Sequence, residues 1–249
     1  MRIDKNKCAG CGQCSANCAL GGIAARRRDP ESGKFYYQID EDECVDCGVC
    51  LRAGVCTTDA LFMPECDYPR SLRSQFSDPL VVHPKTNVPG RGTEEMKTIE
   101  VTGRVTYGQV GIACEMGRPA VGARFTEVEK VAMALAKLDQ VEFEPDNPCT
   151  KVMEDPHKGT FKEEVKNEKV LSAIIEMVVP TEKAKDVLNT IREVAKTVNC
   201  PFSVDLFARL EKDGTLPTTK ILEEIGWEPA PNVKMNTGLG RPLSKEALR

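Results

Sequence analysis

Histidine is scarce in this chain of 249 residues, which contains only two, His83 and His157. Each stands next to a proline, and the two are far apart in the sequence. A Ser–His–Asp triad needs an imidazole beside a nucleophile and an acid, and a histidine metal site needs several imidazoles together. The sequence therefore argues against histidine-based catalysis and histidine-based metal binding.

Long apolar runs and a strong excess of one charge are also missing. No stretch approaches the roughly 18 apolar residues that a membrane-spanning helix needs, and none resembles the apolar core of a secretory signal. The formal net charge is −4, which is too mild to govern nucleic-acid binding by bulk electrostatics. We expect a cytoplasmic protein with no nucleic-acid partner and no membrane partner.

Cysteine, in contrast, is abundant, with 12 residues. Eight of them stand in two copies of one phrase, in which an Ile-Asp pair precedes Cys-x2-Cys-Gly-x-Cys and a single later cysteine. The cysteines of the first copy are Cys8, Cys11, Cys14 and Cys18. The second copy begins 36 residues after the first, and its cysteines are Cys44, Cys47, Cys50 and Cys56.

This spacing suits a [4Fe–4S] cluster, whose four irons each take one thiolate. Three closely spaced cysteines reach three irons only where the backbone curls tightly, and Gly12 and Gly48 inside these curls allow open dihedral angles. In two-cluster proteins of this kind, the fourth thiolate ligates the other cluster. We therefore predict two [4Fe–4S] clusters, with Gly12 and Gly48 in their binding loops. The predicted ligands are Cys8, Cys11, Cys14 and Cys56 for the first cluster and Cys44, Cys47, Cys50 and Cys18 for the second.

Two other uses of cysteine compete with this interpretation. Structural zinc takes four ligands, commonly from two Cys-x2-Cys pairs, whereas each copy here has a triplet and a single cysteine. Disulfides require an exported protein, and no export signal is present. Iron–sulfur clusters are the favoured interpretation, and zinc is the main alternative.

Residues 1–66 resemble a bacterial-type two-[4Fe–4S] ferredoxin, which implies that this segment transfers electrons. Two details differ from the usual pattern of that family. Ala19 and Thr57 stand where a proline commonly follows the fourth cysteine. The second copy separates Cys50 and Cys56 by five residues, where three are usual, so we expect an enlarged loop beside the first cluster.

Between the two copies, a turn-rich segment at 29–33 separates two apolar-rich runs, 23–28 and 35–39. This pattern predicts a β-hairpin. Three consecutive arginines occupy positions 26–28. They suit either a charged edge strand that resists aggregation or a docking patch for an acidic redox partner.

Residues 67–97 are rich in proline and glycine and lack periodicity, which predicts an extended linker arm. A linker of this length is often functional, and we expect it to wrap a neighbouring subunit. Residues 98–230 are predicted to form an α+β domain, and residues 231–249 an irregular polar tail.

The α+β domain is expected to begin with two short strands between Lys97 and Met116. Its further predicted elements are helices at 125–138, 180–198 and 219–225 and strands at 170–179 and 202–210. This order predicts an α+β sandwich, for which the split βαβ arrangement is a candidate. The predicted fold class is thus α+β, a bacterial two-[4Fe–4S] ferredoxin domain followed by this sandwich.

Glycine and arginine gather in the phrase 115–124. Arg118 and Arg124, on a loop entering a helix, suit an anion such as a phosphate or carboxylate, or a partner. A tight turn with surface arginines is the competing interpretation. The chain lacks the Gly-x-Gly-x-x-Gly and Walker motifs of nucleotide sites.

Four cysteines match no cluster spacing: Cys66, Cys114, Cys149 and Cys200. A third cluster is the less favoured interpretation of these residues. We expect them to be small buried apolar residues, as free cysteines commonly are.

The remainder of the chain also resembles 6-hydroxynicotinate reductase-like proteins, ferredoxin-dependent enzymes of anaerobic N-heterocycle breakdown. The phrases that carry this resemblance are 88–97, 115–119 and 237–242. It implies reduction of an aromatic or N-heterocyclic carboxylate, and it assigns no catalytic residue.

The favoured function is an iron–sulfur electron-transfer subunit of an anaerobic oxidoreductase complex. A free carrier needs only the cluster domain, so the further residues indicate attachment to a larger catalytic redox subunit of the flavin, molybdenum or tungsten type. One alternative is the reductase activity itself, with a carboxylated ring bound near Arg118 and Arg124. Another is a redox sensor whose second domain binds a small molecule. A non-catalytic subunit is favoured over a self-sufficient enzyme.

Overall fold

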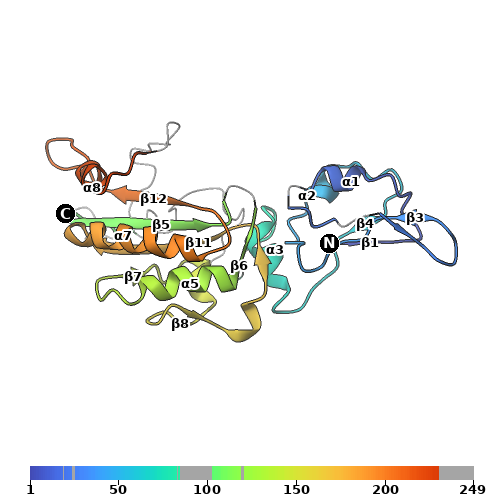
Figure 1. Cartoon of the computed structure of the whole chain (residues 1–249), viewed down its shortest axis with the longest axis horizontal. Coiled ribbons are helices and arrows are strands. Elements are labelled where there is room, and N and C mark those ends of the chain that lie inside the picture. The colour runs from blue at the N-terminus through green and yellow to red at the C-terminus, as the bar shows by residue number, and fades with distance from the viewer. Residues whose placement is uncertain (19, 24–25, 83, 85–102, 119–120, 230–249) are drawn as a thin grey trace. The chain divides into compact units, whose positions relative to one another are not determined.

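The computed structural model describes residues 1–18, 20–23, 26–82, 84, 103–118 and 121–229. The chain divides into two compact units, each assembled from separate stretches of sequence. The first unit comprises residues 1–93, 117–125 and 163–173, and the second comprises 94–116, 126–162 and 174–249. Helices and strands are mixed in both (Figure 1).

The N-terminal part of the first unit is built from two-residue strands and one-turn helices. They are β1 (Arg2–Ile3), α1 (Gln13–Ala16), β2 (Arg27–Arg28), β3 (Phe35–Tyr36), α2 (Val49–Arg52) and β4 (Leu61–Phe62). Strands β1 and β4 pair antiparallel. Strands β2 and β3 also pair antiparallel, so the predicted hairpin around 29–33 is confirmed. With so little regular structure, the cysteine-rich loops make up most of this segment.

Five buried residues form the apolar core of this segment: Met1, Ile23, Ile39, Cys50 and Leu61. Cysteines of both copies pack around it, namely Cys14, Cys18, Cys44 and Cys56. A core of this size is small even for a domain of about 60 residues, which is marginally stable unless metals or cross-links add to it. The fold of this segment therefore depends on what the cysteines bind.

Helix α3 (Ser71–Ser77) stands where the sequence predicts an extended arm. Leu72 and Phe76, four residues apart, are both buried, and an apolar pair at this spacing favours a helix. Phe76 packs edge-on against Phe125, with the ring centroids 5.4 Å apart. Residues 83 and 85–97 of the predicted arm lie outside the described residues.

Two further short strands complete the first unit. Strand β6 (Ala123–Arg124) pairs antiparallel with β10 (Lys169–Val170). The hydroxyl of Ser77 in α3 accepts a hydrogen bond from the N–H of Leu171 at 2.8 Å, which ties α3 to the residue after β10. Residues 117–125 and 163–173 thus group with the N-terminal segment, although the predicted boundary put them in the α+β domain.

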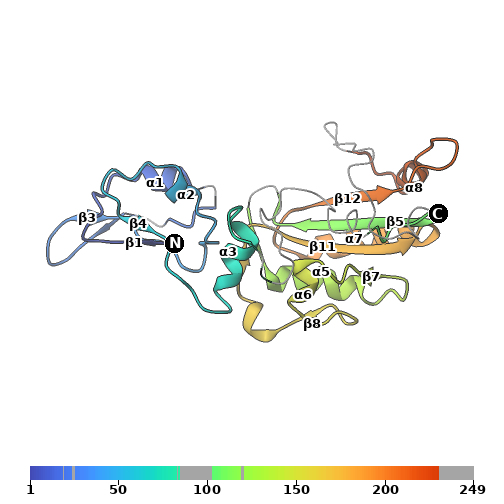
Figure 2. The same cartoon turned by 180° about the vertical axis from the view of Figure 1, so that it is seen from behind.

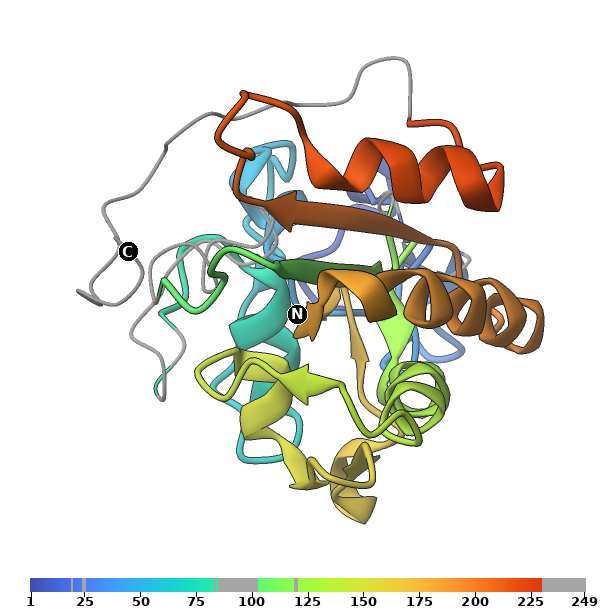
Figure 3. The same cartoon turned by 90° about the vertical axis from the view of Figure 1, so that its left-hand side faces the viewer.

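The second unit is organised around a four-stranded sheet with the strand order β12-β5-β11-β7. The elements of the sheet and its surroundings are β5 (Gln109–Met116), α5 (Phe125–Leu135), β7 (Glu142–Phe143), α6 (Pro148–Lys151), β8 (Met153–Asp155), β9 (Thr160–Phe161), β11 (Ala173–Pro180), η2 (Thr181–Lys183), α7 (Ala184–Val194), η3 (Ala195–Thr197), β12 (Phe202–Ala208) and α8 (Pro217–Ile225). The short turn η1 (Glu163–Val165) belongs to the first unit. Strand β12 pairs antiparallel with β5, and β7 with β11. Figures 1 and 2 show α5 and α7 on the same side of the sheet. Helix α8 contacts β12 at the sheet edge (Figure 3).

The predicted helix over 180–198 is confirmed as the continuous run of η2, α7 and η3. Its apolar stripe faces the core, with five residues of α7 buried: Ala184, Val187, Leu188, Ile191 and Val194. The two short strands predicted between Lys97 and Met116 are replaced, within the described residues 103–116, by the single strand β5. Seven of its eight residues are buried, and Gly108 precedes the strand at φ +78° instead of separating two strands.

None of the helices in the described ranges is both long and apolar enough to span a membrane. The predicted tail, 231–249, lies outside the described residues.

Candidate metal centre

Both glycines of the repeated phrase stand at the start of a one-turn helix in the left-handed backbone conformation. The φ angle is +79° at Gly12, before α1, and +70° at Gly48, before α2. A side chain at Gly12 would place its Cβ 2.7 Å from the Tyr37 hydroxyl oxygen. The chain therefore curls at both positions as expected, because glycine takes this conformation at little cost.

The curled loop of the first copy and the late cysteine of the second copy line one cavity. Its walls include Cys8, Cys11, Cys14 and Cys56, together with Gly12. Cys56 belongs to the second copy, so the cavity combines three thiols of one phrase with the last thiol of the other. This combination matches the ligand set expected for the first cluster.

Cys18, the last cysteine of the first copy, lies close enough to the second triplet for its charge to affect the pKa of those thiols. Burial raises the pKa of Cys47, and the Cys18 thiolate raises it further. Burial and the neighbouring thiolates together raise the pKa of Cys50 to about 11. The neighbours that contribute are Cys47, Cys44, Cys18 and Cys14. Bound iron takes the place of the thiol protons and relieves this mutual repulsion.

Backbone N–H groups point at thiol sulfurs in the first cavity. Gly10 and Tyr37 each donate to Cys8 Sγ at 3.5 Å, and Ala60 donates to Cys56 Sγ at 3.2 Å. Burial acts to raise the pKa of the Cys56 thiol, but backbone N–H groups, Ala60 first among them, lower it, and the net shift is downward. Such hydrogen bonds favour the thiolate, which is the form that binds metal.

Across the described residues, no three His, Cys, Asp or Glu side chains are grouped so as to hold one metal ion. Ligands of a single zinc ion stand about 2.3 Å from the metal and so crowd together, whereas thiolates around a four-iron cube are farther apart. The observed arrangement has sulfur donors spread around a cavity, with N–H groups directed at them. This chemistry fits an iron–sulfur cluster.

Comparison with known proteins bears on the same segment. A family model for the 4Fe-4S dicluster domain matches residues 7–60. An uncharacterized ferredoxin of Methanocaldococcus jannaschii is 38% identical over 61 residues, which cover 24% of this chain and 73% of the relative. The chain belongs to the ferredoxin family with a 4Fe-4S dicluster domain. No solved structure matches it.

The N-terminal segment of this ferredoxin-family chain is therefore an iron–sulfur electron-transfer domain. The family match ends at residue 60, so α3, β6, β10 and the second unit lie outside the matched residues. Of these, α3, β6 and β10 belong to the first unit, and their side chains contact the loop around Cys44.

Arg124, predicted to bind an anion or a partner, contacts the loop that precedes Cys44. Its guanidinium donates to the Asp42 carbonyl oxygen at 3.2 Å and to the Glu43 carboxylate at 3.0 Å. Arg118 donates to the hydroxyl of Ser172 at 3.3 Å. Both guanidinium groups thus contact the protein itself, and Arg124 belongs to the surroundings of the second cluster loop.

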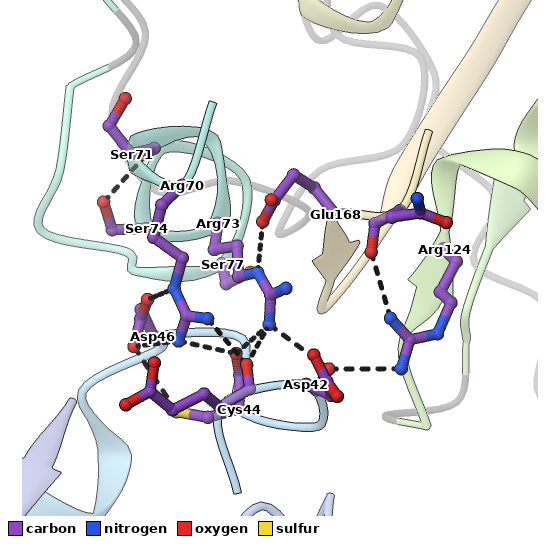
Figure 4. Close-up of polar contacts among 12 residues, drawn as sticks. Asp42, Cys44, Asp46, Arg70, Ser71, Arg73, Ser74, Ser77, Arg124 and Glu168 are labelled. Carbon is purple, nitrogen blue, oxygen red and sulfur yellow. Dashed lines mark hydrogen bonds and ion pairs between the residues drawn. The ribbon is translucent and has the colours of Figure 1, made fainter. Parts of the chain in front are cut away.

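The sequence reasoning missed three other cations beside this loop, Arg70, Arg73 and Lys169. Arg70, which precedes α3, and Arg73 in α3 extend onto the loop around Cys44 (Figure 4). Lys169 pairs with the last acid of the run 41–43. The signal was present in the sequence, because the second copy has three acidic residues where the first copy has Lys-Asn-Lys. Three adjacent acidic residues repel one another, and cationic partners relieve this repulsion.

The other sequence candidates lie apart from these contacts. Burial of the non-motif cysteines is confirmed for Cys114 and Cys149, whereas Cys66 and Cys200 are only half-buried. In the arginine run, Arg26 stacks on the Phe35 ring at 3.9 Å from its centroid. Ala19 lies outside the described residues.

Proposed function

We propose that this chain is an electron-transfer subunit of an anaerobic oxidoreductase complex. It relays single electrons through two [4Fe–4S] clusters to or from a larger catalytic subunit. The ligands are Cys8, Cys11, Cys14 and Cys56 for the first cluster and Cys44, Cys47, Cys50 and Cys18 for the second. Gly12 and Gly48 let each loop close around its cluster.

The observation that carries the proposal is that the last cysteine of each copy lies beside the triplet of the other copy. Cys56 lines the cavity of the first triplet, and Cys18 interacts electrostatically with Cys47 and Cys50 of the second. This arrangement is typical of two-cluster ferredoxins, in which the fourth cysteine of each motif ligates the other cluster. Two independent zinc sites have no need of it.

The closeness of the two sets of cysteines supports a relay. Cys14 of the first set interacts electrostatically with Cys50 of the second, and both pack in the same small core. Bound [4Fe–4S] clusters exchange single electrons, with potentials set by their surroundings. Clusters held this close exchange electrons within one molecule, without a diffusing carrier.

The second unit supports the assignment to a complex. The order β5, α5, β7, β11, α7, β12 supports a split βαβ sandwich, and that fold binds no cluster by itself. A free carrier needs only the ferredoxin domain, so we assign to the second unit attachment to a catalytic redox subunit of the flavin, molybdenum or tungsten type. The alternative is a 6-hydroxynicotinate reductase-like activity, suggested by the phrases 88–97, 115–119 and 237–242, of which the first and the last lie outside the described residues. In that alternative a carboxylated ring binds near Arg118 and Arg124, and both of these side chains contact the protein itself.

Anaerobic affinity purification from the native host tests the proposal, with iron and sulfide quantified and attached subunits identified. We expect about eight irons per chain, four for each cluster, and a large flavin, molybdenum or tungsten subunit. Eight irons on a solitary chain that reduces aromatic acids with a low-potential donor would support the reductase instead. Zinc in place of iron would overturn both.

A further inference from the structure

The two copies of the cysteine phrase differ at one backbone position that has the same conformation in both. Gly10 and Asp46, 36 residues apart, have φ angles of +67° and +53°. A Cβ on Gly10 would lie 2.6 Å from the Phe35 carbonyl oxygen, so the first loop requires glycine. The second loop holds an aspartate in a conformation that is costly for non-glycine residues. The surrounding structure must therefore hold Asp46 in place.

The Asp46 side chain is buried, with 3% of its surface exposed. Its Oδ2 accepts a hydrogen bond from Arg70 Nε at 2.7 Å. Its Oδ1 lies 3.4 Å from the sulfur of Cys44, a ligand of the second cluster under the proposed function. A buried carboxylate thus stands directly beside this ligand.

Arg73 supplies a buried positive charge to the same loop. Only 4% of its surface is exposed. Its Nη1 donates hydrogen bonds to the carbonyl oxygens of Glu41 and Cys44, each at 2.7 Å. Its Nε pairs with Glu168. Figure 4 shows Arg70, the residue before α3, and Arg73, in its first turn, both reaching the loop.

Helix α3 is itself fixed within the first unit. The Ser77 hydroxyl accepts from Leu171 N–H at 2.8 Å, and Phe76 packs on Phe125. The charges of Arg70 and Arg73 are therefore held at the loop by a packed helix, which distinguishes them from a surface ion pair. In the first copy, the run at 5–7 is exposed.

We infer that Asp46 and Arg73 are positioning residues that set the reduction potential of the second cluster separately from that of the first. The inference rests on the proposed function, since it requires a cluster at Cys44, Cys47, Cys50 and Cys18. Reduction adds a negative charge to the cluster. Arg73 is paired with Glu168, and Asp46 with Arg70 and the Met1 ammonium, so removing either charge leaves its partners uncompensated beside the loop. Uncompensated negative charge opposes reduction and uncompensated positive charge favours it, because charges in the interior are weakly screened.

The test is a potentiometric titration, followed by electron paramagnetic resonance, of the anaerobically reconstituted full chain. Arg73→Gln removes a cation and leaves Glu168 uncompensated, so the equilibrium constant for reducing one cluster should fall about tenfold, which is about 59 mV for one electron. Asp46→Asn should raise it by a similar factor. The other cluster should keep its potential in both variants. Arg73→Lys, which retains the charge, should stay near the wild type, as should the control Arg27→Gln on the exposed strand β2.

Opposite shifts confined to one cluster would support the inference. Shifts of the same sign in Asp46→Asn and Arg73→Gln, or equal shifts of both clusters, would overturn it. Where Arg73→Gln loses the cluster, the isosteric Asp46→Asn decides, and an unchanged potential there overturns the inference. A wild-type chain that holds fewer than two clusters would instead contradict the proposed function.

Discussion

Arg52 and Asp78 form an ion pair in which Arg52 Nη1 donates to both carboxylate oxygens at 2.9 Å. Arg52 ends α2 inside the enlarged loop between Cys50 and Cys56, and Asp78 directly follows α3. Arg52 Nη2 also donates to a carbonyl oxygen of the second triplet, that of Cys47, at 2.6 Å. The extra residues of the second copy are therefore anchored to a segment that lies beyond the family match.

Replacing Gly48 by alanine tests the crowding around this ion pair. A Cβ there would lie 2.4 Å from Arg52 Nη1 and 2.8 Å from Asp78 Oδ2, so the arginine must leave the carboxylate. The left-handed backbone adds a cost of about 1–2 kcal/mol for an L-residue. We expect Gly48→Ala to bind less iron after anaerobic reconstitution and to unfold at lower denaturant concentration.

Gly54→Ala is the matched control. Gly54 has φ +63° in the same loop, and no atom lies within 4 Å of the position that an added Cβ would take. This variant carries the backbone cost alone and should keep its full iron content. If both variants lost the same amount of iron, backbone strain and not the Arg52–Asp78 contact would explain the result.

Cysteine substitution separates ligands from core residues. Cys11→Ser should remove or cripple one cluster and destabilise the N-terminal segment, because metal binding and folding are coupled there. Cys149→Ser changes a thiol buried in α6 and should leave iron and sulfide content unchanged. The measurement is iron and sulfide per chain. Equal iron loss in both variants would contradict the ligand assignment.

A core mutation in α7 tests whether the second unit carries its own stability. Leu188 is fully buried, and Leu188→Ala should cost about 2–5 kcal/mol of unfolding free energy through the lost burial and the cavity. Denaturant unfolding followed by far-UV circular dichroism should show this loss while iron content stays constant. Lys185→Ala on the exposed face of the same helix should be nearly neutral. Parallel loss of iron in Leu188→Ala would show that the ferredoxin domain depends on the second unit's core.

Asp213 offers a pH-dependent prediction in the turn after β12. The backbone N–H and the hydroxyl of Thr215 hold the pKa of this carboxyl below its usual value of 3.8. Because the folded pKa is the lower one, the carboxylate stabilises the fold above the unfolded pKa, and this contribution is lost as pH falls through the folded pKa. The stability difference between wild type and Asp213→Asn should shrink as pH falls from about 5 to about 2. A difference independent of pH would exclude this origin.

The sequence was most informative where chemistry fixes the spacing. The positions of Cys8 and its partners, and the left-handed turns at Gly12 and Gly48, follow from wrapping a chain around a cube of iron and sulfide. The helix over α7 was also predictable, since its buried residues recur with helical period. Each of these features is determined by residues close together in the sequence, so a short stretch of sequence is enough to predict it.

The contacts of α3 were not predictable in this way. Arg70 and Arg73 reach residues 24 and 29 positions earlier, and Arg124 and Lys169 reach the same loop from much later positions. No local period or motif encodes such pairings, because they depend on how separate segments pack. Pro69 and Pro79 on either side of α3 masked a local signal, the buried pair Leu72 and Phe76.

Because the first unit is assembled from stretches far apart in the sequence, its parts are synthesised at different times. Ribosomes release the N-terminus first, and domains generally fold as units once all of their residues have emerged. The loop before Cys44 receives Arg124 and Lys169 only after residues 117–125 and 163–173 have been made. The eight motif cysteines thus leave the ribosome well before the scaffold of the second loop is complete, and the two halves of a symmetric motif mature at different times.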